Sequence, residues 1–88
     1  MKVVLTEQEQ IDFVKNDGML IRKIDNPTEL AKIAAVLDNP FAIRHIHNPS
    51  DTVQVIAVIG NDEAVEFIDN DLCNGAKAIA FSGAFELK

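Results

Sequence analysis

The chain has 88 residues, a net charge of −6 and an apolar fraction of 48%, which together indicate one small globular domain rather than a disordered segment. A pI near 4.6 disfavours direct binding of nucleic acid, and a single cysteine excludes an internal disulfide. The apolar runs are far shorter than the roughly 18 residues that span a membrane, so we expect a cytoplasmic protein without a membrane partner.

A repeat of 22 residues organises the predicted elements. When the chain is shifted by 22, the segment 21–28 matches 43–50 and 65–72. A weaker copy opens the chain, and the last copy slips by one residue. We therefore predict one domain over residues 1–88, built from four repeats near 1–20, 21–42, 43–64 and 65–88.

Helix-start signals occur twice in each repeat. Thr6 with Glu9 forms a capping-box pattern, and Asn39-Pro40 combines a cap with a proline at the first helical position. We interpret Asn26-Pro27 and Asn48-Pro49 as the same device, ahead of two longer helices. A turn signal at Asn74-Gly75 predicts a kink or break in the last long helix. The predicted helices are 7–15, 18–24, 27–37, 40–46, 49–59, 62–68, 71–81 and a short one at 84–87.

The apolar pattern differs between the long and the short helices. The helices 27–37 and 49–59 are apolar over most of their circumference, which predicts that they are buried. The short helices are apolar on one side and charged on the other, which predicts an outer layer. No repeat can bury its apolar face alone, so neighbouring repeats must stack. The predicted fold class is all-α: a short stack of about four helix-hairpin repeats, a HEAT-like mini-solenoid with degenerate first and last repeats.

The central repeat carries a recognisable pattern. From Asn48 to Val58 it reads Asn-Pro-Ser-x-x-Val-Gln-x-x-Ala-Val, and Asn61 and a short apolar helix follow. Over residues 21–69 this pattern resembles short α-helical repeats found in uncharacterised proteins of large bacteriophages and some bacteria. The first and last repeats depart from it, as capping repeats do. The resemblance implies a helical repeat protein, of phage or bacterial origin, that binds another macromolecule in the bacterial or infected-cell cytoplasm, and it implies no catalytic residues.

The surface of the short helices is the predicted partner-binding site. Residues 1–44 carry seven acids and six bases, whereas residues 45–88 carry seven acids and two bases. Equivalent positions of stacked repeats face the same way, so the short helices should form one surface that changes from basic to acidic. An ordinary solvated surface is the alternative interpretation. The predicted partner-binding residues are Arg22, Lys23, Arg44, His45, His47, Glu66, Phe67 and Asp69.

Other chemistries find little support in the residues. His45 and His47 alone do not form a closed metal site, so we expect neither a metal nor a cofactor. Cys73 is interpreted as a half-buried thiol at the start of the last long helix, and a thiol enzyme using it is the poorer interpretation. No catalytic motif is present in the sequence, so we expect the protein not to be an enzyme.

Two functions follow from these observations. The first is a non-enzymatic helical module that binds a protein partner. The second is an acidic inhibitor, of the anti-CRISPR or another anti-defence type, that blocks the nucleic-acid-binding surface of a host enzyme. The C-terminal residues Phe81, Phe85 and Leu87 are expected to fold back as a cap or, if exposed, to form a homodimer contact.

Overall fold

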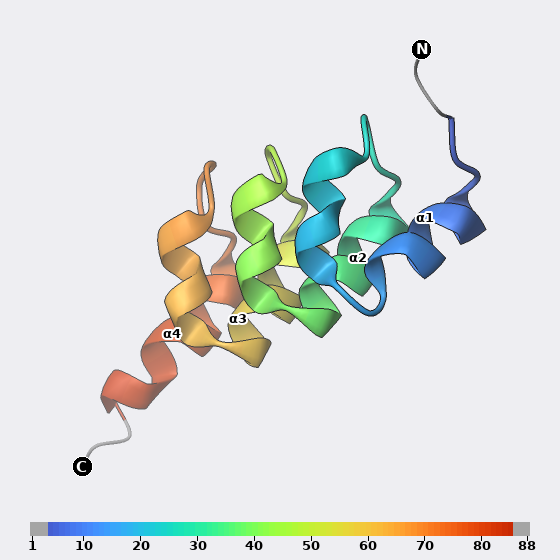
Figure 1. Cartoon of the computed structure of the whole chain (residues 1–88). Coiled ribbons are helices and arrows are strands. Elements are labelled where there is room, and N and C mark those ends of the chain that lie inside the picture. Colours follow the sequence, from blue (N-terminus) through green and yellow to red (C-terminus); the bar gives the residue numbers. More distant parts are fainter. Residues whose placement is uncertain (1–3, 86–88) are drawn as a thin grey trace.

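The computed structural model describes residues 4–85, with side chains described up to residue 80, and consists of α-helices that alternate with short 3₁₀ helices (Figure 1). No strand occurs within these described residues, and the predicted all-α class is confirmed. The α-helices are α1 (Glu7–Val14), α2 (Glu29–Asp38), α3 (Asp51–Gly60) and α4 (Asn74–Phe85), and the 3₁₀ helices are η1 (Gly18–Lys23), η2 (Pro40–His45) and η3 (Asp62–Phe67).

The helix starts recur along the chain at the predicted spacing. α1, α2 and α3 begin 22 residues apart, and so do η1, η2 and η3. α4 begins one residue later than this spacing requires, where the sequence repeat slips. Asn74-Gly75 forms the first turn of α4 rather than a break. The separate helix expected at 84–87 falls partly within α4 and partly outside the described residues.

The helices form two layers. Each α-helix packs beside the next α-helix in the chain, and each short helix packs beside its successor and against the neighbouring α-helices (Figure 1). α1 and α4 therefore lie at opposite ends of the stack. The short helices make up one continuous layer along the molecule, as expected for a stack of units with equivalent orientations.

Two predicted helix starts are confirmed by their caps. The Thr6 hydroxyl accepts a hydrogen bond from the Glu9 N–H at 3.1 Å, and the Thr6 N–H donates to the Glu9 carboxylate at 2.9 Å, which completes a capping box. The Asn39 side chain accepts from the Phe41 N–H at 3.0 Å, and Pro40 is the first residue of η2. These contacts satisfy amide groups that have no partner inside the helix.

The predicted starts of the two central long helices are wrong by two residues. Asn26 and Asn48 do not cap α2 and α3 but adopt the left-handed conformation, with φ of 62° and 53°. Asparagine tolerates this conformation better than most residues, so each Asn-Pro makes a turn ahead of the helix. Thr28 and Ser50 are the actual caps, and their hydroxyls accept backbone hydrogen bonds at 3.2 Å.

The hydrophobic core runs along the stack as rows of equivalent residues. Val14, Val36 and Val58 hold the same position in α1, α2 and α3, and each is at most 1% exposed. Ile21 and Ile43 form the matching row in η1 and η2. These units thus contribute equivalent side chains to a core shared with their neighbours, which distributes the apolar burial along the molecule.

The expectation that the long helices are buried all round is wrong. Leu30 and Leu37 of α2 are 52% and 68% exposed, and Ile59 of α3 is 66% exposed. A helix in a two-layer stack has neighbours on both sides and in the other layer, which leaves one side uncovered. The apolar outer sides of α2 and α3 are therefore solvent-exposed.

Two buried glutamines join neighbouring units. The Gln10 amide donates to the Leu5 carbonyl at 3.2 Å, while its oxygen accepts from the Thr28 N–H at 2.9 Å. Gln54 accepts in the same way from the Cys73 N–H at 2.8 Å. Gln10 and Gln54 are 7% and 1% exposed, so these polar side chains lie within the stack with their hydrogen-bonding groups satisfied.

The starts of η1 and η2 also meet the end of the following α-helix. The Gly18 N–H donates to the Asp38 carboxylate at 2.7 Å, and a Cβ atom on Gly18 would lie 2.2 Å from the carbonyl oxygen of Ala35. At the next junction Pro40 has no N–H to donate. Gly60 stands opposite, and a Cβ atom there would lie 2.5 Å from the proline ring.

Candidate functional site

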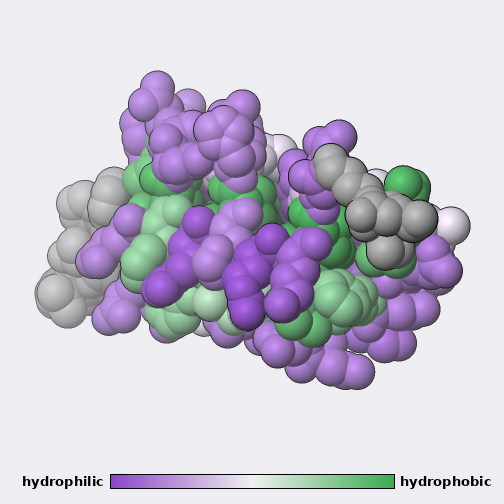
Figure 2. Space-filling model, turned by 45° about the horizontal axis from the view of Figure 1, so that its top comes forward, coloured by the Kyte–Doolittle hydropathy of each residue, from purple (hydrophilic) through white to green (hydrophobic). Residues whose placement is uncertain are grey.

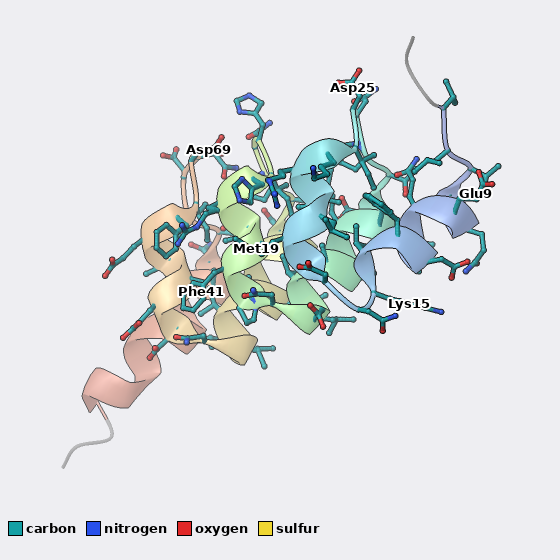
Figure 3. All side chains as sticks on the ribbon, viewed as in Figure 1. Glu9, Lys15, Met19, Asp25, Phe41 and Asp69 are labelled. Carbon is teal, nitrogen blue, oxygen red and sulfur yellow. The ribbon has the colours of Figure 1, made fainter. Side chains whose placement is uncertain are left out.

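The outward sides of η1, η2 and η3 make up the surface that the sequence predicts to bind a partner. Because the units repeat, residues 22 apart line up in rows across this surface, such as Arg22, Arg44 and Glu66. The labelled side chains of Met19 and Phe41 mark this surface in Figure 3. We call it the short-helix face and define it by Met19, Arg22, Lys23, Phe41, Arg44, Asp62, Glu63, Glu66 and Phe67.

A cation–aromatic cluster occupies the middle of the short-helix face. The rings of Phe41 and Phe67 meet edge to face, with centroids 5.6 Å apart and an interplanar angle of 88°. The Arg44 guanidinium carbon lies 4.2 Å from the centroid of the Phe67 ring. Both geometries are attractive for a ring with a negative face and a positive edge. Arg44 is exposed, whereas the two phenylalanines are half-buried, so the cluster is open to solvent on one side.

The Phe67 side chain is held by packing contacts, unlike that of a fully exposed binding residue. It packs against the buried residues of the core in addition to Phe41. Its lysine and histidine equivalents in η1 and η2, Lys23 and His45, are both exposed. Phe67 therefore contributes to both the stability of the third unit and the apolar centre of the face.

The charge on the short-helix face changes sign along the stack. η1 carries the bases Arg22 and Lys23, and η3 carries the acids Asp62, Glu63 and Glu66. Figure 2 shows hydrophilic and hydrophobic residues side by side on the surface of the stack. The Arg22 guanidinium donates to the Met19 carbonyl at 3.1 Å, which holds it close to its own helix. The six exposed charged side chains of the face are Arg22, Lys23, Arg44, Asp62, Glu63 and Glu66.

Two other predicted residues meet at the loop edge, where the turns that follow the short helices lie. His47 Nδ1 and an Asp69 carboxylate oxygen are 2.8 Å apart, and the other Asp69 oxygen accepts from the Asn48 N–H at 2.8 Å. The Asn48 N–H, with a smaller contribution from His47, lowers the pKa of Asp69 below its ordinary value, although burial opposes this effect. The His47 side chain is 94% exposed.

The predicted binding residues thus fall into two groups. Arg22, Lys23, Arg44, Glu66 and Phe67 lie together on the short-helix face. His47 and Asp69 lie at the loop edge, and the exposed His45 ends η2 between them and the face.

Phe41 was missed by the sequence analysis. It lies 26 residues before Phe67, so their contact requires the knowledge that η2 and η3 pack side by side. The available signal was the row that Phe41 shares with Met19 and Glu63 on the predicted outer layer.

A groove of about 660 Å³ at the α1 end of the stack was also missed. Its apolar wall includes Val4 and Phe13, which are 89% and 40% exposed. Phe13 holds the position that belongs to the fully buried Ala35 and Ala57 in α2 and α3. A larger residue at this position in the first unit was the available signal. The groove is lined by Val4, Leu5, Gln10, Phe13, Lys23, Ile24, Asp25 and Asn26.

Cys73 lies where the sequence predicts, half-buried directly before α4. Its sulfur accepts a hydrogen bond from the Ala76 N–H at 3.4 Å and lies 3.8 Å from the Asp51 carbonyl oxygen. The first of these contacts is that of a helix N-terminal cap. The thiol also borders a pocket of about 390 Å³ between the starts of α3 and α4.

Within the described residues, no three His, Cys, Asp or Glu side chains are grouped so that they could hold a metal ion. None of the helices described is long and apolar enough to cross a membrane. The described part of the chain does not include the Leu87 side chain or those of Phe81 and Phe85, on which the expected cap or homodimer contact depends. Comparisons with protein-family models, curated proteins and solved structures gave no match to this chain.

Proposed function

We propose that this chain is a non-enzymatic helical module that binds a protein partner through its short-helix face. The observation that carries the proposal is the cluster of Phe41, Arg44 and Phe67, which is open to solvent at the centre of that face. Aromatic residues and arginine are enriched in the cores of protein interfaces, and a few such residues dominate the binding energy. As the resemblance to phage and bacterial repeats implies, we take the partner to be cytosolic.

The charges around the cluster support recognition of one orientation of the partner. Arg22 and Lys23 lie on one side of it, and Glu63 and Glu66 lie on the other. Complementary charge at the edge of an interface guides encounter and fixes register more than it adds affinity. The partner surface should therefore be acidic opposite η1 and basic opposite η3.

A capture experiment tests this function. The immobilised protein and its Arg44→Ala variant would each be exposed to cytosol from the source, and bound proteins would be identified by mass spectrometry. Lys15→Ala is the matched control, because it also removes one exposed cation but lies at the end of α1, away from Phe41 (Figure 3). We expect a partner that is retained by the native chain and the control and lost with Arg44→Ala. Equal capture by Arg44→Ala, or no partner at all, would contradict the proposal.

The acidic inhibitor is a second proposal, supported by the acids of η3 and the loop after it. Asp62, Glu63 and Glu66 are exposed, whereas Asp69 is already bonded to its neighbouring loop. Competition for a nucleic-acid groove by these acids should weaken steeply as salt is raised. Binding centred on the aromatic cluster should respond weakly to salt, so a salt titration of the captured complex separates the two proposals.

A further inference from the structure

The short-helix face is electrically neutral although the chain is strongly acidic. Its three exposed bases balance its three exposed acids, whereas the whole chain carries a net charge of −6. The charges are also arranged with opposite polarity at the two ends: η1 contributes two bases, η2 one base and η3 three acids. A copy of this surface turned end to end sets the basic η1 opposite the acidic η3.

We infer that the short-helix face binds a second copy of this chain, in a two-fold arrangement that sets η1 of each protomer against η3 of the other. The inference rests on the proposed function of this face and names its partner. A two-fold interface requires one patch to be complementary to itself, and the reversal of charge from η1 to η3 meets that requirement. In this arrangement Arg22 of each protomer lies opposite Glu66 of the other, because both belong to the same row.

The centre of the face fits this arrangement. Half-buried Phe41 of η2 supplies apolar surface near the two-fold axis. Arg44 belongs to η2, but its stacking on Phe67 draws the guanidinium toward η3. The two Arg44 charges of a dimer are thereby moved away from the axis, where they would otherwise repel each other.

The negative charge on the rest of the molecule disfavours contacts between two copies through acidic surfaces. Acidic surfaces of two copies repel each other on approach, and this repulsion is screened only beyond about 8 Å at physiological ionic strength. A neutral, charge-reversing face with an apolar centre is a surface on which two copies can meet without that cost. The second copy is therefore the partner that the charge pattern of this face favours.

A charge exchange tests the inference. The native chain, Arg22→Glu, Glu66→Arg and the double variant would be compared by sedimentation equilibrium from micromolar to millimolar concentration. We expect the native chain to be a dimer. Each single variant should raise the dissociation constant at least about tenfold, and the double variant should return it to within about threefold of the native value. Lys15→Glu, which alters the net charge as Arg22→Glu does but lies off the face, should leave the dimer intact. Circular dichroism would confirm that each variant keeps its helices.

A cross-linking measurement tests the orientation without reversing charge. In a Cys73→Ser background, Arg22→Cys chains mixed with Glu66→Cys chains should form a disulfide-linked pair, and Glu66→Cys chains alone should not. A native chain that stays monomeric, a double variant that fails to recover, or the absence of the mixed disulfide overturns the inference. A monomeric chain that still captures a partner dependent on Arg44 leaves the proposed function standing.

Discussion

Arg44 and Phe67 share one contact on the short-helix face but stabilise the protein to different degrees. Arg44 is exposed, and a cation over an aromatic ring contributes about 0.5–1 kcal/mol at such a site. Phe67 is half-buried and packs against the core. We therefore expect Arg44→Ala to leave folding nearly unchanged, which is why this variant serves as the test of the proposed binding.

We predict that Phe67→Ala lowers the free energy of unfolding by about 2 kcal/mol, below the roughly 3–5 kcal/mol lost when a fully buried phenylalanine is truncated. Arg44→Ala should lower it by about 1 kcal/mol or less. Urea denaturation followed by circular dichroism measures both losses. Equal losses for the two variants would show that Phe67 contributes no more packing than an exposed residue.

The hydrogen bonds of Asp69 predict a stability that depends on pH. Its pKa is lowered in the folded state, so its stabilising contribution is present above the ordinary aspartate pKa of about 3.9 and is lost as pH falls through the folded-state value. We expect the native chain to be more thermostable than Asp69→Asn near neutral pH, and the difference to shrink below about pH 4. Thermal unfolding of both proteins across this range measures it.

His47→Ala is the control for the Asp69 prediction. The Asn48 N–H is the largest cause of the lowered pKa, and it is a backbone group that this variant leaves in place. His47→Ala should therefore keep most of the acid dependence of the native chain. Asp69→Asn with the same acid dependence as the native chain would contradict the assignment.

At the scale of the elements, the Asn-Pro pair has two different roles. Asn39-Pro40 starts η2, as predicted, whereas the same pair at Asn26 and Asn48 forms a turn two residues before an α-helix. The local difference lies in the residue after the proline, because Thr28 and Ser50 carry a hydroxyl that can cap a helix, whereas Phe41 does not. The existence and spacing of the helices could thus be predicted from the sequence, but the choice between two adjacent caps depends on how the turn packs.

The buried Gln54 fastens α4 to α3, and we predict that Gln54→Ala loosens this junction. It leaves the Cys73 N–H without its acceptor, which costs about 1–3 kcal/mol for a buried donor. Hydrogen exchange at Cys73 and in α4 should become faster than in α1. The exposed Thr52, also in α3, supplies the control: Thr52→Ala should change stability by no more than about 0.5 kcal/mol. Uniform acceleration along the chain would argue against a local role.

At the scale of the whole molecule, sequence reasoning predicted the architecture better than the site. The repeat predicts which helices are equivalent, and this is enough to predict the order in which the helices stack. The contact between Phe41 and Phe67 and the groove beside Phe13 depend on packing between units and at the end of the stack. This contact and this groove arise from how the units stack in three dimensions, which the sequence of a single repeat does not determine.

A stack in which each unit contacts only its neighbours should tolerate the loss of one unit. Deleting residues 29–50 joins Thr28 to Asp51 and keeps the acceptors Gln10 and Gln54 with their partners. We predict that the 66-residue product remains helical and unfolds cooperatively, at a lower temperature than the native chain. Circular dichroism and thermal melting measure both properties.

Deleting residues 29–39 is the matched control, because it removes α2 but keeps η2. Two short helices would then follow each other without the α-helix between them, and the two layers could not both continue. This shorter deletion should lose helical structure despite removing half as many residues. If it were the more stable of the two products, the 22-residue unit would not be the structural unit.

The junction of Gly18 with Asp38, and of Pro40 with Gly60, limits how freely such units can be exchanged. At the first junction the Gly18 N–H faces the Asp38 carboxylate. At the second, the Pro40 ring faces Gly60, which has no side chain. Copying Pro40 into the first unit without also replacing Asp38 would set a carboxylate against a proline that has no N–H. For designers who lengthen this array, the interchangeable module is a matched pair of residues 20 positions apart, which crosses the boundaries of the repeat.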